Sequence, residues 1–146
     1  WFLTDYPMHE KLREYVRFLN KFYKHHDAMY SIDGSWDGFS WLSVDESELC
    51  CAAFMRTGVS GRRIICACNF SDKERRLTIG IPDSGRLIQI MDSACEFWGG
   101  SARASHSNVL SSPVGFREFR HSAVVRLSPL SCAYYFYKTS EASNGC

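Results

Sequence analysis

Residues 39–70 read FSWLSVDESELCCAAFMRTGVSGRRIICACNF, and this stretch decides the fold class. It holds three short apolar runs, at 39–44, 49–56 and 62–70, which are separated by the polar connectors DESE and TGVSG. Short apolar runs bounded by turn residues are typical of β-strands, and connectors of this length suit hairpins. We therefore predict antiparallel strands throughout this stretch.

The same pattern continues toward the C-terminus, with no further helical periodicity. Four more apolar or alternating runs occur at 76–81, 86–92, 122–127 and 132–138. The connectors SDKER and PDSG are also hairpin-sized, so most neighbouring strands are expected to pair with each other. The long connection at 95–121 is expected to cross between sheets or to form a surface loop. Seven short strands over about 100 residues predict a mainly β fold, an antiparallel β-sandwich of two sheets packed face to face.

One long amphipathic α-helix precedes the predicted strands. Pro7 suits its first turn, and the cationic or titratable side chains of residues 24–26 suit its C-terminal end. Its apolar side chains fall on one broad arc at about 100° per residue. They are Met8, Leu12, Tyr15, Val16, Leu19, Phe22 and Tyr23. We predict a heavily buried helix that packs on the outside of one sheet, on a further part of the protein, or on both.

Composition excludes several classes of function. The 146 residues carry 17 Lys and Arg against 16 Asp and Glu, and the formal charge of +1 argues against a nucleic-acid partner. No apolar stretch approaches the ~20 residues of a membrane-spanning helix, and no secretory signal pattern is visible. We expect no membrane partner and a cytoplasmic location.

The seven cysteines are interpreted mainly as small buried strand residues. Cys66 and Cys68, beside the Cys50–Cys51 pair, could form a thiolate metal site, but they lack the two-residue gap of structural zinc knuckles. The trio at residues 25–27 is another weak metal candidate at the helix end. Cys146 lies on the tail. The sequence thus predicts no metal site and no cofactor.

The chain as a whole resembles the C-terminal end of bacterial 1,4-alpha-glucan (glycogen) branching enzymes, of the alpha-amylase superfamily of glycoside hydrolases. DYPMHEKLREYVRFLNKFY resembles the last helix of that family's (β/α)8 barrel, and DGFSWLSVDESE resembles the entry to its all-β C-terminal domain. CNFS, FWGGS and HSAVVRLSPLSCAYYFY match later landmarks in the same order.

This resemblance implies a division of the chain and a role. Residues 1–30 would be the last barrel helix, 31–138 the C-terminal all-β domain, and 139–146 a flexible tail. Because the chain starts inside the loop before that helix, we expect a piece of a longer enzyme whose barrel is a partner. In the family, the catalytic carboxylates lie on barrel strands, so no catalytic residue is expected here and the piece alone should be inactive.

Alpha-glucan or glycogen is the ligand that the resemblance implies. Tryptophan offers a flat apolar face to sugar rings together with a polar N–H group. Trp36, in a turn, and Trp98, in the long connection, are the candidate glucan contacts, with packing against the barrel as the rival interpretation. The resemblance places Trp1 and Asp5 near the catalytic face of the barrel.

Other candidates are given structural interpretations. Trp41 alternates with Phe39 in a strand and is expected to lie in the core. Asp45, Glu46 and Glu48 are expected to form a solvated hairpin loop rather than a catalytic group. Two alternative functions stay open: a stand-alone carbohydrate-binding module, or a structural or protein-interaction β-sandwich. An exposed apolar helix face would favour self-association.

Overall fold

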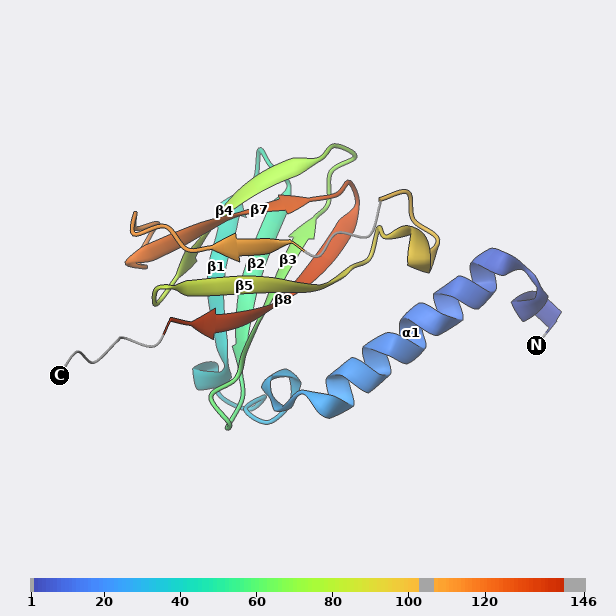
Figure 1. The fold of residues 1–146 in the computed structure, drawn as a ribbon, viewed down its shortest axis with the longest axis horizontal. Coiled ribbons are helices and arrows are strands. Elements are labelled where there is room, and N and C mark those ends of the chain that lie inside the picture. The colour runs from blue at the N-terminus through green and yellow to red at the C-terminus, as the bar shows by residue number, and fades with distance from the viewer. Residues whose placement is uncertain (1, 103–106, 141–146) are drawn as a thin grey trace.

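The protein consists of two antiparallel sheets packed face to face, with one long helix whose C-terminal half packs on the outer face of the larger sheet (Figure 1). The structure, a computed structural model, describes residues 2–102 and 107–140, apart from the side chains of Thr4, Asp45 and Glu46. The strands are β1 (Phe39–Glu46), β2 (Cys51–Thr57), β3 (Arg63–Asn69), β4 (Arg75–Ile81), β5 (Gly85–Asp92), β6 (Asn108–Leu110), β7 (His121–Leu127) and β8 (Ser131–Thr139). The predicted mainly β sandwich is confirmed.

The larger sheet has the strand order β1-β2-β3-β8-β5-β6, and the smaller sheet pairs β4 with β7. The hairpins β1–β2 and β2–β3 form as predicted. Pairing across the connectors SDKER and PDSG was predicted wrongly, because each of them carries the chain from one sheet to the other. The connection at 95–121 also crosses between the sheets, and it contributes the short strand β6 on its way.

Asn69, at the end of β3, holds two crossings between the sheets together, the β3–β4 connector and the connection from β7 to β8. Its side chain is buried, and its Nδ2 atom donates hydrogen bonds to the carbonyl oxygens of Lys73 (2.8 Å) and Ser128 (2.9 Å). Its Oδ1 atom accepts hydrogen bonds from the backbone N–H and the hydroxyl group of Ser71. Residues 71–73 lead into β4 and Ser128 follows β7, so one side chain fixes both of these connections.

The core between the sheets is formed by alternate side chains of the facing strands, as the period of two in a β-strand requires. The burial pattern of β8 alternates over seven residues. Its inner face contributes Ala133, Tyr135 and Tyr137 to this core. The fully buried side chains Ile65, Leu77, Ile79, Leu87, Val125 and Leu127 complete most of it.

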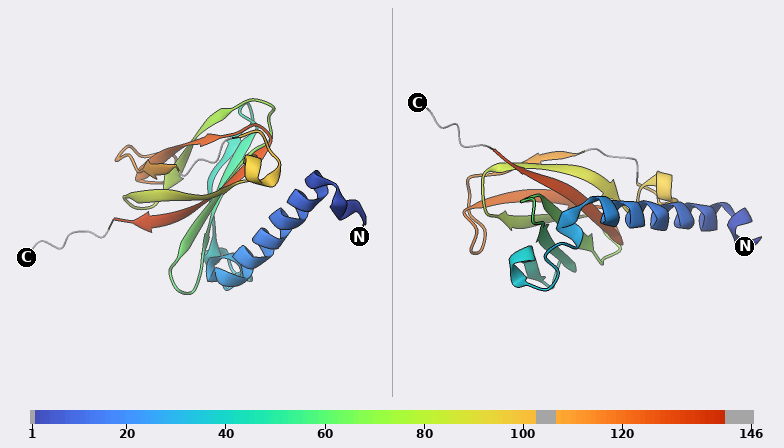
Figure 2. Two further views of the ribbon diagram at one scale, coloured as in Figure 1. Left: turned by 45° about the vertical axis from the view of Figure 1, so that its right-hand side comes forward. Right: turned by 90° about the horizontal axis from the view of Figure 1, so that it is seen from below.

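The helix α1 (Pro7–His25) covers the opposite, outer face of the larger sheet (Figure 2). Phe22 is buried against Ile64 of β3 and lies 5.6 Å from the Tyr134 ring and 6.4 Å from the Phe136 ring of β8. These contacts form a second apolar cluster that is separate from the core between the sheets. The helix therefore packs on the outside of a sheet, as one of the predictions stated.

The prediction of a heavily buried helix is wrong. Phe22 is its one side chain that the structure buries among those described. Met8, Leu12, Val16 and Tyr23 are 61%, 56%, 47% and 47% exposed. The physical reason is that the N-terminal half of α1 extends past the edge of the sheets (Figures 1 and 2). Phe18 and Phe22, on one side of the apolar arc, make the contact with the sheet. We call these four exposed residues the apolar stripe.

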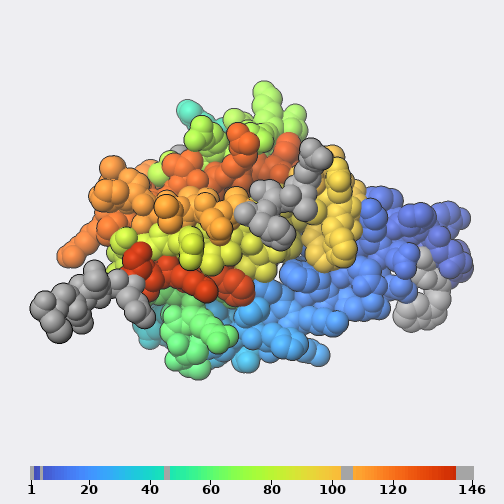
Figure 3. All heavy atoms as spheres, viewed as in Figure 1, coloured from blue at the N-terminus to red at the C-terminus, as the bar shows by residue number. Residues whose placement is uncertain are grey.

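A second contact holds the N-terminal half of the helix. The short 3-10 helix η4 (Glu96–Trp98) lies against it, as the space-filling view shows (Figure 3). The Trp98 ring lies 5.4 Å from Tyr15 and 5.2 Å from Phe18, and the Lys11 ammonium group donates to the carbonyl oxygen of Glu96. None of the described helices is long and apolar enough to cross a lipid bilayer.

The connector after α1 is held by the β2–β3 hairpin. The Asp27 carboxylate accepts a hydrogen bond from the backbone N–H of Ser60 at 2.9 Å. A hydrogen bond with the Ser60 side chain, together with this backbone bond, lowers the pKa of that carboxyl group. Gly58 lies so close to this connector that an added Cβ atom would stand 2.4 Å from an Asp27 carboxylate oxygen. The end of the helix is thereby fixed to the sheet.

Removal of the Phe22 ring tests how strongly α1 is anchored. We expect Phe22→Ala to lower the free energy of unfolding by about 3 kcal/mol, because it leaves a cavity between the helix and the sheet. Tyr23→Ala is the matched control, since the neighbouring ring is 47% exposed and its loss should cost less than about 1 kcal/mol. Urea unfolding followed by circular dichroism measures both, and equal losses would contradict the proposed anchor.

The lowered pKa of His26 predicts that the stability of the fold depends on pH. Burial lowers its pKa, and the nearby Arg62 and His25 add to the shift while Asp27 opposes it. Its ring lies 4.4 Å from Phe22 and 5.1 Å from Phe136. The neutral ring is therefore favoured in the folded state, so its contribution to stability is present above the unfolded pKa of about 6.5 and is lost as the pH falls through the lowered folded pKa.

We expect the urea midpoint of the native chain to fall between about pH 7.5 and pH 5.5, and His26→Gln to flatten this decline. His9→Gln, at an exposed position of the helix, is the control and should keep the native pH profile. A His26→Gln profile as steep as the native one would assign the pH dependence to other groups.

Candidate functional site

Aromatic side chains gather on the outer face of the larger sheet at its β1–β2 edge. Phe39 of β1 stacks on Phe54 of β2 with 5.3 Å between ring centroids, and Trp41 stands edge-on to both rings at 5.1 and 6.0 Å. Trp36 approaches Phe39 at 6.1 Å from the preceding turn. We call these four residues, Trp36, Phe39, Trp41 and Phe54, the aromatic platform. Trp36 is 81% exposed and Trp41 is 45% exposed, so both present ring surface to solvent.

The turn that presents Trp36 is fixed by local chemistry. Trp36 begins the 3-10 helix η3 (Trp36–Gly38), and the Ser35 hydroxyl oxygen accepts a hydrogen bond from the backbone N–H of Asp37 at 3.1 Å. Gly38 lets this turn pack closely, since an added Cβ atom would stand 2.3 Å from the Ile32 carbonyl oxygen. Only glycine fits this position without a shift of the backbone, so the ring of Trp36 is held at the surface.

A charged pair borders the platform. Arg56 of β2 forms an ion pair with Asp33, and its Nε atom donates to the carbonyl oxygen of Ala28 at 3.4 Å. Together with residues 33–36, Phe39 and Trp41, Arg56 lines a hollow of about 410 Å³. The hollow thus combines apolar ring faces with a carboxylate and a guanidinium group that can exchange hydrogen bonds with hydroxyl groups.

The exposure of Trp41 corrects the prediction that this side chain lies in the core. Phe39 and Trp41 do share one face of β1, but that face is the outer one, and the core is reached by Leu42. The register shifts between Trp41 and Ser43, which lets Leu42 and Ser43 both be buried. The outer face at β1 lies beyond the strands that contact α1, so Trp41 stays exposed.

The other predicted aromatic and acidic candidates lie apart from the platform. Trp98 is half-buried in η4 and contacts Tyr15, Phe18 and Phe97. Asp5 is exposed at the end of the 3-10 helix η1 (Phe2–Asp5), and Trp1 lies outside the described residues. The structure therefore brings neither Asp5 nor Trp98 to Trp36.

The remaining polar candidates have separate environments. Glu48 is exposed in the turn after β1, and the side chains of Asp45 and Glu46 lie outside the described part. The His25 ring bonds the Lys21 carbonyl oxygen, His26 packs on Phe22, and Asp27 accepts from Ser60. Among the described residues, residues 25–27 do not form a group of metal-ligating atoms.

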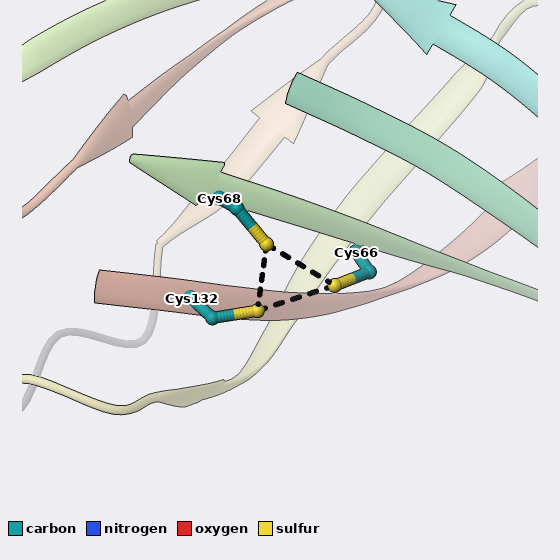
Figure 4. A group of neighbouring side chains, drawn as sticks. All are labelled: Cys66, Cys68 and Cys132. Carbon is teal, nitrogen blue, oxygen red and sulfur yellow. Dashed lines mark hydrogen bonds between the residues drawn. The ribbon is translucent and has the colours of Figure 1, made fainter. Parts of the chain in front are cut away.

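Three thiols of the larger sheet, however, converge (Figure 4). Cys66 and Cys68 of β3 and Cys132 of β8 bring their Sγ atoms within 4.8 Å of one another. The prediction considered Cys66 and Cys68 beside Cys50–Cys51, but Cys50 is exposed and Cys51 points into the core between the sheets. The partner that the sequence analysis missed is Cys132, which pairs with Cys68 across the strands.

Hydrogen bonds among the thiols perturb their acidities. Hydrogen bonds with Cys132 and Cys66 lower the pKa of Cys68 to about 3. Hydrogen bonds to Cys132 and Cys68, together with burial, raise the pKa of Cys66. For Cys132, the bond with Cys66 lowers the pKa, but the bond with Cys68 and burial outweigh it and raise the pKa to about 12. The arrangement favours one thiolate among three sulfurs.

Sequence reasoning also missed Arg56 and Asp33 as neighbours of Trp36. Arg56 is a lone charge at the end of an apolar run, which was a usable signal for a residue at the edge of a site. Its partner could not be identified, because Asp33 lies 23 residues earlier in a turn.

The chain is similar in sequence to known proteins over most of its length. Residues 41–138 match the family model described as the alpha amylase C-terminal all-beta domain. The 1,4-alpha-glucan branching enzyme GlgB of Aliivibrio fischeri is 34% identical over 94% of this chain and 19% of its own length. The enzyme of the same name from Aromatoleum aromaticum is 29% identical over 97% of this chain and 22% of its own.

These curated relatives are much longer than the chain, which spans about a fifth of their length. Among solved structures, the trehalulose synthase MutB from Pseudomonas mesoacidophila MX-45 has a TM-score of 0.39 and 22% identity, over 68% of this chain and 14% of that chain.

Proposed function

Because the chain belongs to the family of alpha amylase C-terminal all-beta domains, we propose that it forms the non-catalytic C-terminal part of a 1,4-alpha-glucan branching enzyme. The observation that carries this proposal is the match over 94% and 97% of the chain to relatives with that name. In the intact protein, the reaction would cleave an alpha-1,4 bond and transfer the released segment to a 6-hydroxyl group.

The chain alone is expected to lack this activity. A retaining reaction of this kind needs two carboxyl groups about 5 to 5.5 Å apart, one as nucleophile and one as acid. Under this proposal, both belong to the barrel of the intact protein. Several described carboxylates instead have structural partners: Asp33 pairs with Arg56, Asp83 with Arg63 and Glu74 with Arg126. The role proposed for this part is therefore support and glucan contact.

We assign the glucan contact to the aromatic platform. Its two exposed tryptophans offer apolar faces to pyranose rings, and Asp33 and Arg56 lie beside them to bond the sugar hydroxyl groups. Of the two tryptophans predicted as glucan contacts, Trp36 lies in this setting. Trp98 packs on the helix, so we do not include it in the proposed contact surface.

We assign a different role to the apolar stripe on α1. Four large side chains about half exposed or more, on one helix face, are unusual on a surface in contact with water. The relatives have about four fifths of their length outside the matched region. We propose that the stripe packs against this remaining part, the barrel, and that the chain by itself associates through it.

One observation favours a second candidate, a stand-alone carbohydrate-binding module. Such a module requires a helix that covers its own sheet and aromatic side chains on an open face. Phe22 packs α1 on β3 and β8, and the aromatic platform is open. The apolar stripe distinguishes the candidates, because a stand-alone module has no use for it.

Native gel electrophoresis with glycogen in the gel tests the glucan contact. We expect glycogen to retard the native chain, and Trp36→Ala to weaken the binding by about tenfold, since the loss of a tryptophan face removes on the order of 1.4 kcal/mol or more. Trp41→Ala should act in the same direction.

Two control variants sharpen this test. Phe70→Ala removes a ring that is 68% exposed and lies directly after β3, outside the aromatic platform, and Trp98→Ala removes the tryptophan that packs on the helix. Both should keep the native retardation. Retardation that is lost in Trp98→Ala and kept in Trp36→Ala would overturn the assignment to the aromatic platform.

Sedimentation equilibrium tests the apolar stripe. We expect the apparent mass of the native chain to rise with concentration, because an uncovered apolar helix face drives association. The double variant Leu12→Ser/Val16→Ser should stay monomeric, while Lys21→Ser on the same helix should behave as the native chain. A native chain that is monomeric throughout would favour the stand-alone module.

A further inference from the structure

The three thiols beneath α1 share a geometry that packing does not explain. The Sγ atoms of Cys66 and Cys68 are 3.8 Å apart, and each lies 3.2 Å from the Sγ atom of Cys132. The sulfur atoms of all three side chains point toward one another (Figure 4). A buried cysteine that acts as a small apolar side chain has no need of this convergence.

The fold produces this convergence through strand geometry. Cys66 and Cys68 are two residues apart on β3, so they lie on one face of the sheet. Cys132 on β8 is the register partner of Cys68, and Tyr134 is the partner of Cys66. This face is the outer one, where α1 covers it. The sulfur triangle is therefore held by two neighbouring strands in the middle of the larger sheet.

The distances fit metal ligation better than a disulfide. Sulfurs bound at about 2.3 Å to one tetrahedral ion lie about 3.8 Å from each other. The Cys66–Cys68 separation is 3.8 Å, and the two shorter separations need to open by a few tenths of an ångström. A disulfide, with about 2.0 Å between sulfurs, would use two of the thiols and leave the third beside it without a role.

The surroundings are suited to a partly shielded ion. Cys66 is buried, whereas Cys68 and Cys132 are half-buried, so an ion can enter from their side. The backbone N–H of Cys132 donates to the Ser93 hydroxyl oxygen at 2.9 Å, which fixes the start of β8. Tyr15 of α1 lies close enough that the thiols raise its pKa, after the larger effect of burial.

We propose that Cys66, Cys68 and Cys132 form a binding site for one thiophilic d¹⁰ metal ion, of the class of Zn²⁺, Cd²⁺ or Cu⁺. Thiolate ligands select these soft ions over Mg²⁺, Ca²⁺ or Mn²⁺. On binding, each cysteine that is still a thiol gives its proton to solvent and forms a sulfur–metal bond, with no change of oxidation state. Three protein ligands leave one coordination position for water.

The sequence analysis predicted no metal site, so this proposal departs from it. The proposed site is also independent of the proposed branching function. The bound ion would link β3 to β8, whose residues are about 64 positions apart in the chain. It would lie under α1, so it would stabilise the surface on which the helix packs. We therefore expect metal binding to raise the melting temperature of the chain.

The test titrates the whole 146-residue chain, reduced and free of metal, with CdCl₂ and records the ultraviolet thiolate-to-cadmium charge-transfer band. One equivalent is expected to saturate this band and to raise the melting temperature. Cys68→Ser and Cys132→Ser should each lose both effects. Cys50→Ser and Cys95→Ser, which change an exposed and a buried cysteine outside the group, should keep both.

The melting temperature of each metal-free variant separates a lost site from a lost fold. A folded Cys68→Ser chain that gives the native band would overturn the proposal, and so would a folded native chain that gives no band. If Cys68→Ser does not fold, Cys66→Ala takes its place and is held to the same two readouts. A reduced native chain that forms a Cys68–Cys132 disulfide again and binds no cadmium would also count against the site.

Discussion

The hydrogen bonds of the buried Asn69 side chain are the constraint on which the arrangement of the two sheets depends. This amide satisfies carbonyl groups of two different crossings, after β3 and after β7, at the point where the chain leaves one sheet for the other. A buried amide without these partners would cost roughly 1 to 3 kcal/mol. Both crossings meet at this point, where β8 begins beside β3, and the three thiols on the outer face come together through that pairing.

The outer face of the larger sheet is divided between two tasks. Its central strands β3 and β8 carry Ile64, Phe136 and the three thiols, and α1 covers them. Its edge strand β1 and the neighbouring strand β2 lie beyond the helix and carry the aromatic platform. One sheet therefore provides both a shielded surface and an open one, and the position of α1 sets the boundary between them.

Local features of this fold were predictable from sequence, and long-range ones were not. Pro7 and the apolar runs located the helix and seven strands, because period and turn chemistry are local properties. The three-residue β6 is too short to show a period. The pairing of Cys68 with Cys132, and the outward face of Trp41, depend on which strands become neighbours. At the aromatic platform, Trp36 could be predicted from the sequence as a candidate contact. Arg56 and Asp33 could not, because they form their ion pair only in the folded chain.

The segment between α1 and β1 connects the helix to the aromatic platform mechanically. Asp27 bonds the β2–β3 hairpin through Ser60, and the Ala28 carbonyl oxygen accepts from the same Arg56 side chain that pairs with Asp33. Each of these contacts joins the end of the helix to the strands that carry the platform. Under the proposed function, α1 belongs to the barrel side and the platform to the β-domain side. A glucan on the platform would then be held at a fixed position relative to the barrel, because the connector is bonded at both of its sides instead of acting as a flexible linker.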